Sequence, residues 1–246
     1  MVLLETKSAD LIALSDGDLQ RDGASAPLPV QPLLVLCPEG PALVDTGLGA
    51  LRSGEMDEHG RTLTDALDEH GVKPDSIRLV FLTHLHYDHS GGLVTGGRLT
   101  FKNAMHFIQA AEARAALDER PQPEARYPIR LLREFLLLQP DLKTLDGDFT
   151  VSPLFRLHHT GGHTPGHQMI EVCARPSTFA IGDIASDRFY LEPGRRLKIH
   201  DNPEKIEQIK KFLKGERARG ATLYLYHDPC PFVSPDEETK PEEVRG

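Results

Sequence analysis

Residues 83–92 read THLHYDHSGG, and this stretch decides how the rest of the chain is interpreted. It places three histidines and one aspartate within six positions, directly after an apolar run. Side chains two apart in an extended segment point the same way, so His84 and His86 can reach one cation. Asp88 and His89 lie further around the loop and would point to a second position nearby. Burial without a cation would leave these polar groups unpaired at a high free-energy cost, so the stretch predicts part of a metal site.

The remaining ligands must come from elsewhere, because no single strand can surround a cation. Other apolar runs lead to ligand-type residues: His163 lies within GGHTPGH, Asp183 follows Ala-Ile-Gly, and His227 follows Leu-Tyr-Leu-Tyr. Neutral imidazoles and carboxylates form a donor set that Zn²⁺ accepts at about 2.0–2.2 Å. We interpret His167 as a group that hydrogen-bonds a ligand or the backbone. The other histidines are interpreted as ordinary structural groups: His59, His70, His106, His158, His159 and His200.

Short strands and helices alternate along the chain. Apolar runs at 33–36 and 42–44, separated by Pro-Glu-Gly-Pro, predict a hairpin. Thr62, with Asp65 three residues later, predicts a capped helix that ends at Gly71. We expect further strands over 77–82, 104–108 and 222–226, and further helices over 110–117 and 203–215. This alternation is typical of an α/β protein.

Two segments have unusual composition. Residues 129–138, IRLLREFLLL, are strongly apolar. Burial in the core is the ordinary interpretation, and a lid over an apolar substrate or a homodimer face is the alternative. No break in composition marks a domain boundary, so we expect one domain over 1–246, with a disordered charged tail at 234–246.

Composition excludes several classes of function. The net charge of −9 argues against broad binding to nucleic acid or to an anionic membrane, both of which need a basic surface. No stretch approaches the length of a membrane span, and we expect no secretory signal. Cys37, Cys173 and Cys230 are odd in number and far apart, which predicts reduced thiols and a cytoplasmic location. Cys230 is predicted to be a buried, inert thiol.

The motif His84-x-His86-x-Asp88-His89 resembles the signature of the metallo-β-lactamase superfamily. The resemblance extends in order along nearly the whole chain, through Asp45-Thr46-Gly47, the histidine motif, Gly162-His163-Thr164-Pro165-Gly166-His167, Gly182-Asp183 and His227. It implies an α/β fold, a four-layer αβ/βα sandwich in which two mixed β-sheets lie face to face between helices. The metal site is then expected along one edge of the sandwich.

The resemblance also implies how the ligands are shared between two divalent metal ions. One ion takes His84, His86 and His163, the other takes Asp88, His89 and His227, and Asp183 bridges them, with Asp45 orienting the site. Zn²⁺ is the expected metal, with Fe or Mn as alternatives. Two such ions lie about 3.5–4 Å apart and share a hydroxide, which is the nucleophile. Asp88 and Asp183 are therefore the expected catalytic carboxylates.

Within the superfamily, the chain is most similar to the compact N-acyl homoserine lactonases and the related organophosphate hydrolases. We expect a metal-dependent hydrolase that acts on a small lactone or carboxylic ester. Hydrolysis of an organophosphate or phosphoester is the first alternative, and a mononuclear iron sulfur dioxygenase is the second. A ligand-sensing module without turnover is the non-enzymatic alternative.

The chain departs from the lactonases at one position. In those enzymes a tyrosine lies three residues after the bridging aspartate and contacts the lactone. Here that position is Ser186, and the nearest tyrosine is Tyr190, which we name as the candidate substrate contact. An apolar pocket formed by residues 129–138 would suit an acyl chain.

Overall fold

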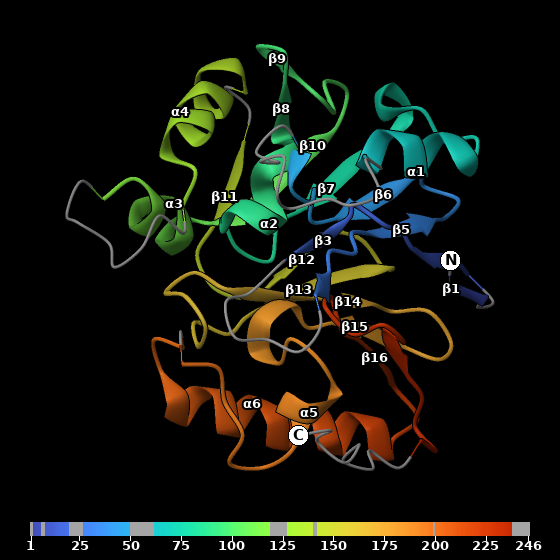
Figure 1. Cartoon of the computed structure of the whole chain (residues 1–246). Helices are drawn as coiled ribbons and strands as arrows, with labels where there is room; N and C mark the ends of the chain where they lie inside the picture. The colour runs from blue at the N-terminus through green and yellow to red at the C-terminus, as the bar shows by residue number, and fades with distance from the viewer. Residues whose placement is uncertain are drawn as a thin grey trace.

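The computed structural model describes residues 2–5, 8–19, 27–49, 62–118, 127–139, 142–198 and 200–237. Within these ranges the chain forms a seven-stranded sheet, a six-stranded sheet and two short two-stranded pairs. The two large sheets face each other across one core, and helices cover their outer faces (Figure 1). The predicted α/β fold with two mixed sheets between helices is confirmed.

The first sheet is formed by the N-terminal half of the chain, in the order β1-β2-β5-β6-β7-β10-β11. Its strands are β1 (Val2–Glu5), β2 (Asp10–Ala13), β5 (Leu33–Leu36), β6 (Ala42–Val44), β7 (Leu79–Phe81), β10 (Met105–Gln109) and β11 (Lys143–Leu145). Pairing is antiparallel from β1 to β6 and parallel from β6 to β11. The predicted hairpin is β5–β6, in which Leu33 lies opposite Val44.

The second sheet follows in the order β12-β13-β14-β15-β16-β17. Its strands are β12 (Phe149–Thr150), β13 (Phe155–His159), β14 (Gln168–Val172), β15 (Thr178–Ala180), β16 (Thr222–Tyr224) and β17 (Phe232–Val233). Only β15 and β16 pair in parallel. The short pairs are β3 (Asp18–Leu19) with β4 (Leu28–Pro29), and β8 (Val94–Thr95) with β9 (Arg98–Leu99).

Alternation along the strands explains the continuous apolar runs. In β5, Leu33 and Val35 point into the core between the sheets, whereas Leu34 points into the layer beneath the helices. Successive side chains of a strand point to opposite faces, so a strand covered on both faces is apolar throughout. Phe81 of β7 and Phe155 of β13 meet across the central core, with ring centroids 4.9 Å apart.

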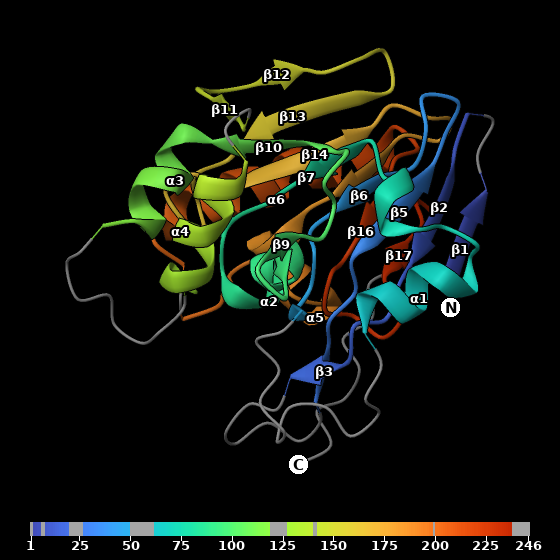
Figure 2. The ribbon, with the colours of Figure 1, turned by 90° about the horizontal axis from the view of Figure 1, so that it is seen from above.

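Helices complete the outer layers. The first sheet is covered by α1 (Leu63–Glu69), α3 (Ala110–Ala116) and α4 (Ile129–Leu138), and the second by α6 (Pro203–Ala218). Figure 2 shows α3 and α4 together at the β11 end of the molecule and α1 at the opposite end. Shorter helices are η2 (Pro74–Ser76), α2 (Tyr87–Ser90), η3 (Gly91–Leu93), η4 (Gly182–Ile184) and α5 (Arg188–Leu191). Thr62 and Asp65 form the predicted capping box of α1.

Some predicted boundaries are wrong. Helix α6 continues past Gly215 to Ala218, and the chain turns away near Gly220, which has a φ of +97°. An interior glycine costs a helix only about 1 kcal/mol, which the packing of buried Leu213 can offset. The strands expected over 77–82 and 222–226 are shorter, at Leu79–Phe81 and Thr222–Tyr224, because both segments then turn toward the ligand-type residues.

The apolar segment 129–138 forms α4. Leu131, Leu132 and Phe135 are buried, so the interpretation as core is confirmed for this face. Leu137 is 86% exposed, and a lid or a homodimer face on that side stays a prediction.

Other expectations concern the termini and the thiols. All three cysteines are free, but Cys230 is exposed, so its predicted burial is wrong. Arg217 donates hydrogen bonds to the carbonyls of Ser234 and Glu237, whereas residues 238–246 of the tail, like His59, lie outside the described residues. Within the described ranges, no helix is both long and apolar enough to cross a membrane.

Candidate metal centre

The ligand-type residues predicted from the sequence come together from four separate segments. His84 and His86 follow β7, and His163 lies in the loop between β13 and β14. Asp183 lies in η4, directly after β15, and His227 follows β16. Two groups of buried donor atoms result, one with His84, His86, His163 and Asp183, and one with Asp88, His89 and His227.

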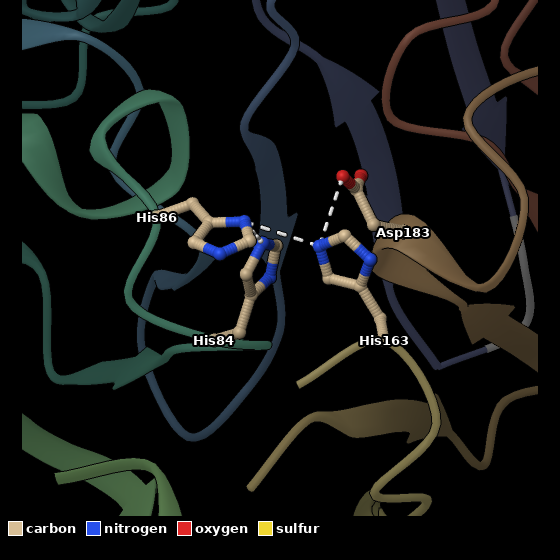
Figure 3. A group of neighbouring side chains, drawn as sticks. All are labelled: His84, His86, His163 and Asp183. Atoms are coloured by element: carbon tan, nitrogen blue, oxygen red, sulfur yellow. Dashed lines mark hydrogen bonds and ion pairs between the residues drawn. The ribbon is translucent and has the colours of Figure 1, made fainter. Parts of the chain in front are cut away.

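Three histidines and Asp183 form the first group. His84 Nε2 lies 3.0 Å from His86 Nδ1, and His163 Nε2 lies 3.1 Å from the same nitrogen of His86. Asp183 Oδ2 lies 3.4 Å from His163 Nε2. Figure 3 shows the side chains of this group converging, with the Asp183 carboxylate directed at His163. The group thus presents nitrogen donors of three rings and one carboxylate oxygen.

The second group lies beside the first. Asp88 Oδ2 lies 3.8 Å from His89 Nε2 and 3.4 Å from His227 Nε2. Asp183 Oδ1 lies 3.4 Å from His89 Nε2 and 3.6 Å from His227 Nε2. One oxygen of Asp183 therefore faces the first group and the other faces the second.

These spacings fit two divalent metal ions. Two donors bound at about 2.0–2.1 Å to one tetrahedral Zn²⁺ lie about 3.3–3.4 Å apart. The donor atoms here are 3.0–3.8 Å apart. His89 Nε2, His227 Nε2 and Asp183 Oδ1 are also buried without a hydrogen-bond partner, which is costly unless a cation binds them.

Asp45 orients the second group and connects it to the first. Its Oδ2 lies 2.8 Å from His89 Nδ1 and accepts a hydrogen bond from Thr83 Oγ1 at 2.7 Å. Because the Thr83 hydroxyl donates its proton to Asp45, its oxygen is left to accept the Nδ1–H of His84 at 3.0 Å. Both histidines then direct Nε2 at the site. In spite of burial, the neighbouring carboxylates raise the pKa of His89 well above its ordinary value, so a cation bound at its Nε2 would replace a proton. Asp45 has a φ of +60°, an uncommon conformation outside glycine that is found at functional sites.

His227 and Asp88 have further partners on other segments. His227 Nδ1 donates to the carbonyl of Pro29 at 2.8 Å, which leaves Nε2 free to bind a cation. The hydroxyl of Tyr226 donates to the backbone carbonyl of Asp88 at 2.8 Å, and its ring stacks on His89 with centroids 4.1 Å apart.

Two histidines hold the backbone of Asp183. His167 Nε2 accepts a hydrogen bond from the Asp183 N–H at 3.2 Å, and His200 Nε2 donates to its carbonyl at 2.9 Å. Burial lowers the pKa of His167 to about 3, so the ring stays neutral and its Nε2 remains an acceptor. His167 therefore hydrogen-bonds a ligand-type residue, as the sequence predicted.

The ionisation states also suit metal binding. Burial holds the pKa of His84 and of His163 well below the ordinary histidine value, so both rings are neutral near pH 7. Burial tends to raise the pKa of Asp183, but the charge and hydrogen bond of His89, whose own pKa is raised, hold it well below its usual value. Neutral imidazole and ionised carboxylate are the forms that bind metals.

Three of the ligand-type residues keep a small exposed fraction. His86 is 5% exposed, Asp88 is 6% exposed and Asp183 is 3% exposed, whereas the other ligand-type residues are fully buried. A substrate must therefore approach past these three side chains.

Several residues at the site were not predicted from the sequence. Thr83 and Tyr226 adjoin predicted ligands, and their position beside His84 and His227 is the one signal that could have identified them. Glu112 gave no signal of this kind, because it is a single glutamate in the first turn of α3.

Tyr190 and Ser186 lie in the segment after Asp183. Tyr190 is in α5, packs against the core cluster beneath α6, and contacts the ring of Phe189 with centroids 5.1 Å apart. Ser186 is buried, its hydroxyl donates to Asp187, and its carbonyl accepts a hydrogen bond from the backbone N–H of His227. The contact of Tyr190 with a substrate stays a prediction.

Comparison with known proteins agrees with this geometry. Residues 27–227 match the Metallo-beta-lactamase superfamily. An N-acyl homoserine lactonase of Bacillus cereus is 34% identical over 221 residues, which cover 82% of each chain.

Solved structures share the fold of this chain. A probable metal-dependent hydrolase from Staphylococcus aureus superimposes with a TM-score of 0.85 over 96% of both chains, at 19% identity. The B. thuringiensis protein AiiA, solved with N-decanoyl-L-homoserine at its active site, superimposes with a TM-score of 0.69 at 26% identity, over 92% of this chain and 95% of that one. The chain belongs to the metallo-beta-lactamase superfamily.

Proposed function

We propose that this protein is a metal-dependent hydrolase with two metal ions, most suitably Zn²⁺, and that it opens the ring of a small lactone of the N-acyl homoserine lactone type. One observation carries the two-metal part: the two oxygens of Asp183 face two separate groups of buried donors. A mononuclear site would need only one of these groups, and the second would remain buried without a partner.

The lactone part of the proposal is supported by similarity. The B. cereus relative is an N-acyl homoserine lactonase, and the similarity covers 82% of both chains. The AiiA structure holds an N-acyl homoserine at its active site. A substrate would reach the site at His86, Asp88 and Asp183, the ligand-type residues that keep some exposure.

The chemistry divides between the cations and the chain. Two divalent cations held by these donors would supply Lewis acidity, which would polarise the carbonyl of the substrate and lower the pKa of a water molecule. The chain's own residues place the donors and handle protons. The carboxylate of Asp88 stays ionised because His89 and His227 lower its pKa in spite of burial. The Asp88 oxygen that would not hold a cation can therefore accept the proton of the attacking water and return it to the alkoxide oxygen released when the ring opens.

The test is metal analysis of the purified protein together with turnover of lactones, aryl esters and phosphotriesters. We expect two zinc ions per chain, lactone hydrolysis with release of acid, and loss of turnover in His84→Ala. His158→Ala is the control, since His158 lies on β13 and pairs with Glu171.

Other outcomes would replace the proposal. Turnover of phosphotriesters without lactones would make the protein an organophosphate hydrolase. One iron per chain, with oxygen consumption on a persulfide, would indicate a sulfur dioxygenase. Lactone binding without any turnover would indicate a sensor.

A further inference from the structure

A buried glutamate outside the metal groups accepts hydrogen bonds from two separate loops. Glu112, in the first turn of α3, is fully buried. Its Oε1 accepts from the Leu85 N–H at 3.0 Å, and its Oε2 accepts from Thr164 Oγ1 at 2.6 Å and from the Gly166 N–H at 3.1 Å. Tyr127 lies close enough to this carboxylate to influence its pKa. A buried carboxylate is costly unless it is bonded in this way, so the arrangement specifies where both loops lie.

The loops that Glu112 joins carry the first metal group. Leu85 lies between His84 and His86, and Thr164 follows His163 directly. The ring of Tyr127 in turn packs beside His86, with centroids 5.0 Å apart. The hydrogen bonds of Glu112 therefore reach the residues next to all three histidines of one group.

Close packing fixes the same contact. A Cβ atom added to Gly166 would lie 2.1 Å from the backbone nitrogen of Glu112. The loop after His163 therefore rests directly on the first turn of α3, and it cannot shift toward the helix. The hydrogen bonds prevent it from shifting away.

The second metal group has a different set of supports. Asp45 bonds His89, the carbonyl of Pro29 bonds His227, and Tyr226 bonds the backbone of Asp88. The hydrogen bonds of Glu112 go to Leu85, Thr164 and Gly166, not to Asp45, Pro29 or Tyr226. The two sets of supports meet at Thr83, through which Asp45 also reaches His84.

We propose that Glu112 is a positioning residue that sets the separation of the two loops around the three-histidine group, and that it controls the metal affinity of this position alone. The inference rests on the proposed function, because it requires two metal positions. It makes the three-histidine position adjustable through a residue that touches neither metal.

The test is Glu112→Gln in the full chain, with Zn²⁺ affinity measured by competition with a chromophoric chelator. Glutamine keeps the shape of the side chain but turns one acceptor into a donor, which then faces an N–H or a hydroxyl donor. In a His227→Ala background, which retains the first group, we expect affinity to fall by about 10–100-fold. In a His84→Ala background, which retains the second group, we expect no change beyond about twofold.

Controls separate this effect from a general loss of structure. Glu171→Gln changes a carboxylate on β14 that pairs with His158 and Ser177, and it should leave both affinities unchanged. If Glu112→Gln does not fold, as judged by circular dichroism, Thr164→Val decides the question, because it removes the shortest of these hydrogen bonds and keeps the carboxylate.

Two results would overturn the inference. One is an unchanged affinity at the three-histidine position, and the other is an equal loss at both positions. A wild-type chain that binds one zinc ion instead contradicts the proposed two-metal function, so the two failures can be told apart.

Discussion

At the scale of single residues, Asp45 gives the sharpest prediction. Its two oxygens accept hydrogen bonds from Thr83 and face His89, so it sets the orientation of a donor in each metal group. Asp45→Asn replaces one acceptor by an amide that cannot accept from His89 or Thr83. We expect zinc affinity or kcat/KM to fall by about 10–100-fold, measured by chelator competition and lactone turnover. Asp10→Asn, at an exposed position of β2, is the matched control, and equal values for both variants would contradict this role.

A second residue-scale prediction concerns His106 of β10. Burial lowers its pKa from about 6.5 to about 4, and its Nε2 has no hydrogen-bond partner. The unfolded chain therefore binds a proton between pH 6.5 and pH 4 that the folded chain does not. This group stabilises the fold fully above pH 6.5, and its contribution is lost as the pH falls toward 4.

His106→Gln removes this titration and isolates its effect. Between pH 7 and pH 4, the wild type should lose about 3 kcal/mol more unfolding free energy than the variant, since one pKa unit corresponds to about 1.36 kcal/mol. Urea unfolding of both proteins across this range measures the difference. Parallel curves would show that His106 does not titrate in this way.

At the scale of elements, α4 is a helix with one buried and one exposed apolar side. Leu132 is 1% exposed and Leu137 is 86% exposed. Leu132→Ala leaves a cavity in the layer above the first sheet and should cost about 2–5 kcal/mol of unfolding free energy. Leu137→Ala should change it by less than about 0.5 kcal/mol. Chemical denaturation of the two variants compares them directly, and similar losses would mean that Leu137 is also covered.

Elements also show what a sequence can and cannot predict. The ligand-type residues that converge in the structure could be picked out because each follows an apolar strand or a glycine-containing turn, a pattern that is local in the chain. The end of α6 was not, because packing of Leu213 outweighs the helix-breaking tendency of Gly215. Glu112 was not predictable either, since its partners Leu85 and Thr164 lie 27 and 52 residues away and only the fold brings them together.

At the scale of the whole molecule, the metal centre joins the two halves of the chain. His84 and His86 follow the first sheet, whereas His163 and Asp183 belong to the second. In the second metal group, Asp88 and His89 come from the N-terminal half of the chain and His227 comes from the C-terminal half. His227 also hydrogen-bonds the carbonyl of Pro29, 198 residues earlier in the chain. Each bound cation would therefore cross-link both sheets.

Removal of the metals should consequently destabilise the entire fold and not only the loops. A ligand that binds only the folded state adds about 2.7 kcal/mol of stability when its free concentration is about 100 times Kd, and two positions add more. We expect chelation with EDTA to lower Tm by several degrees and added Zn²⁺ to restore it, with far-ultraviolet circular dichroism as the measurement. Asp183→Ala should unfold near the temperature of the chelated wild type and respond little to zinc, because the carboxylate between the two groups is gone. An unchanged Tm after chelation, with metal loss verified by mass spectrometry, would mean that the sheets hold together without help from the centre between them.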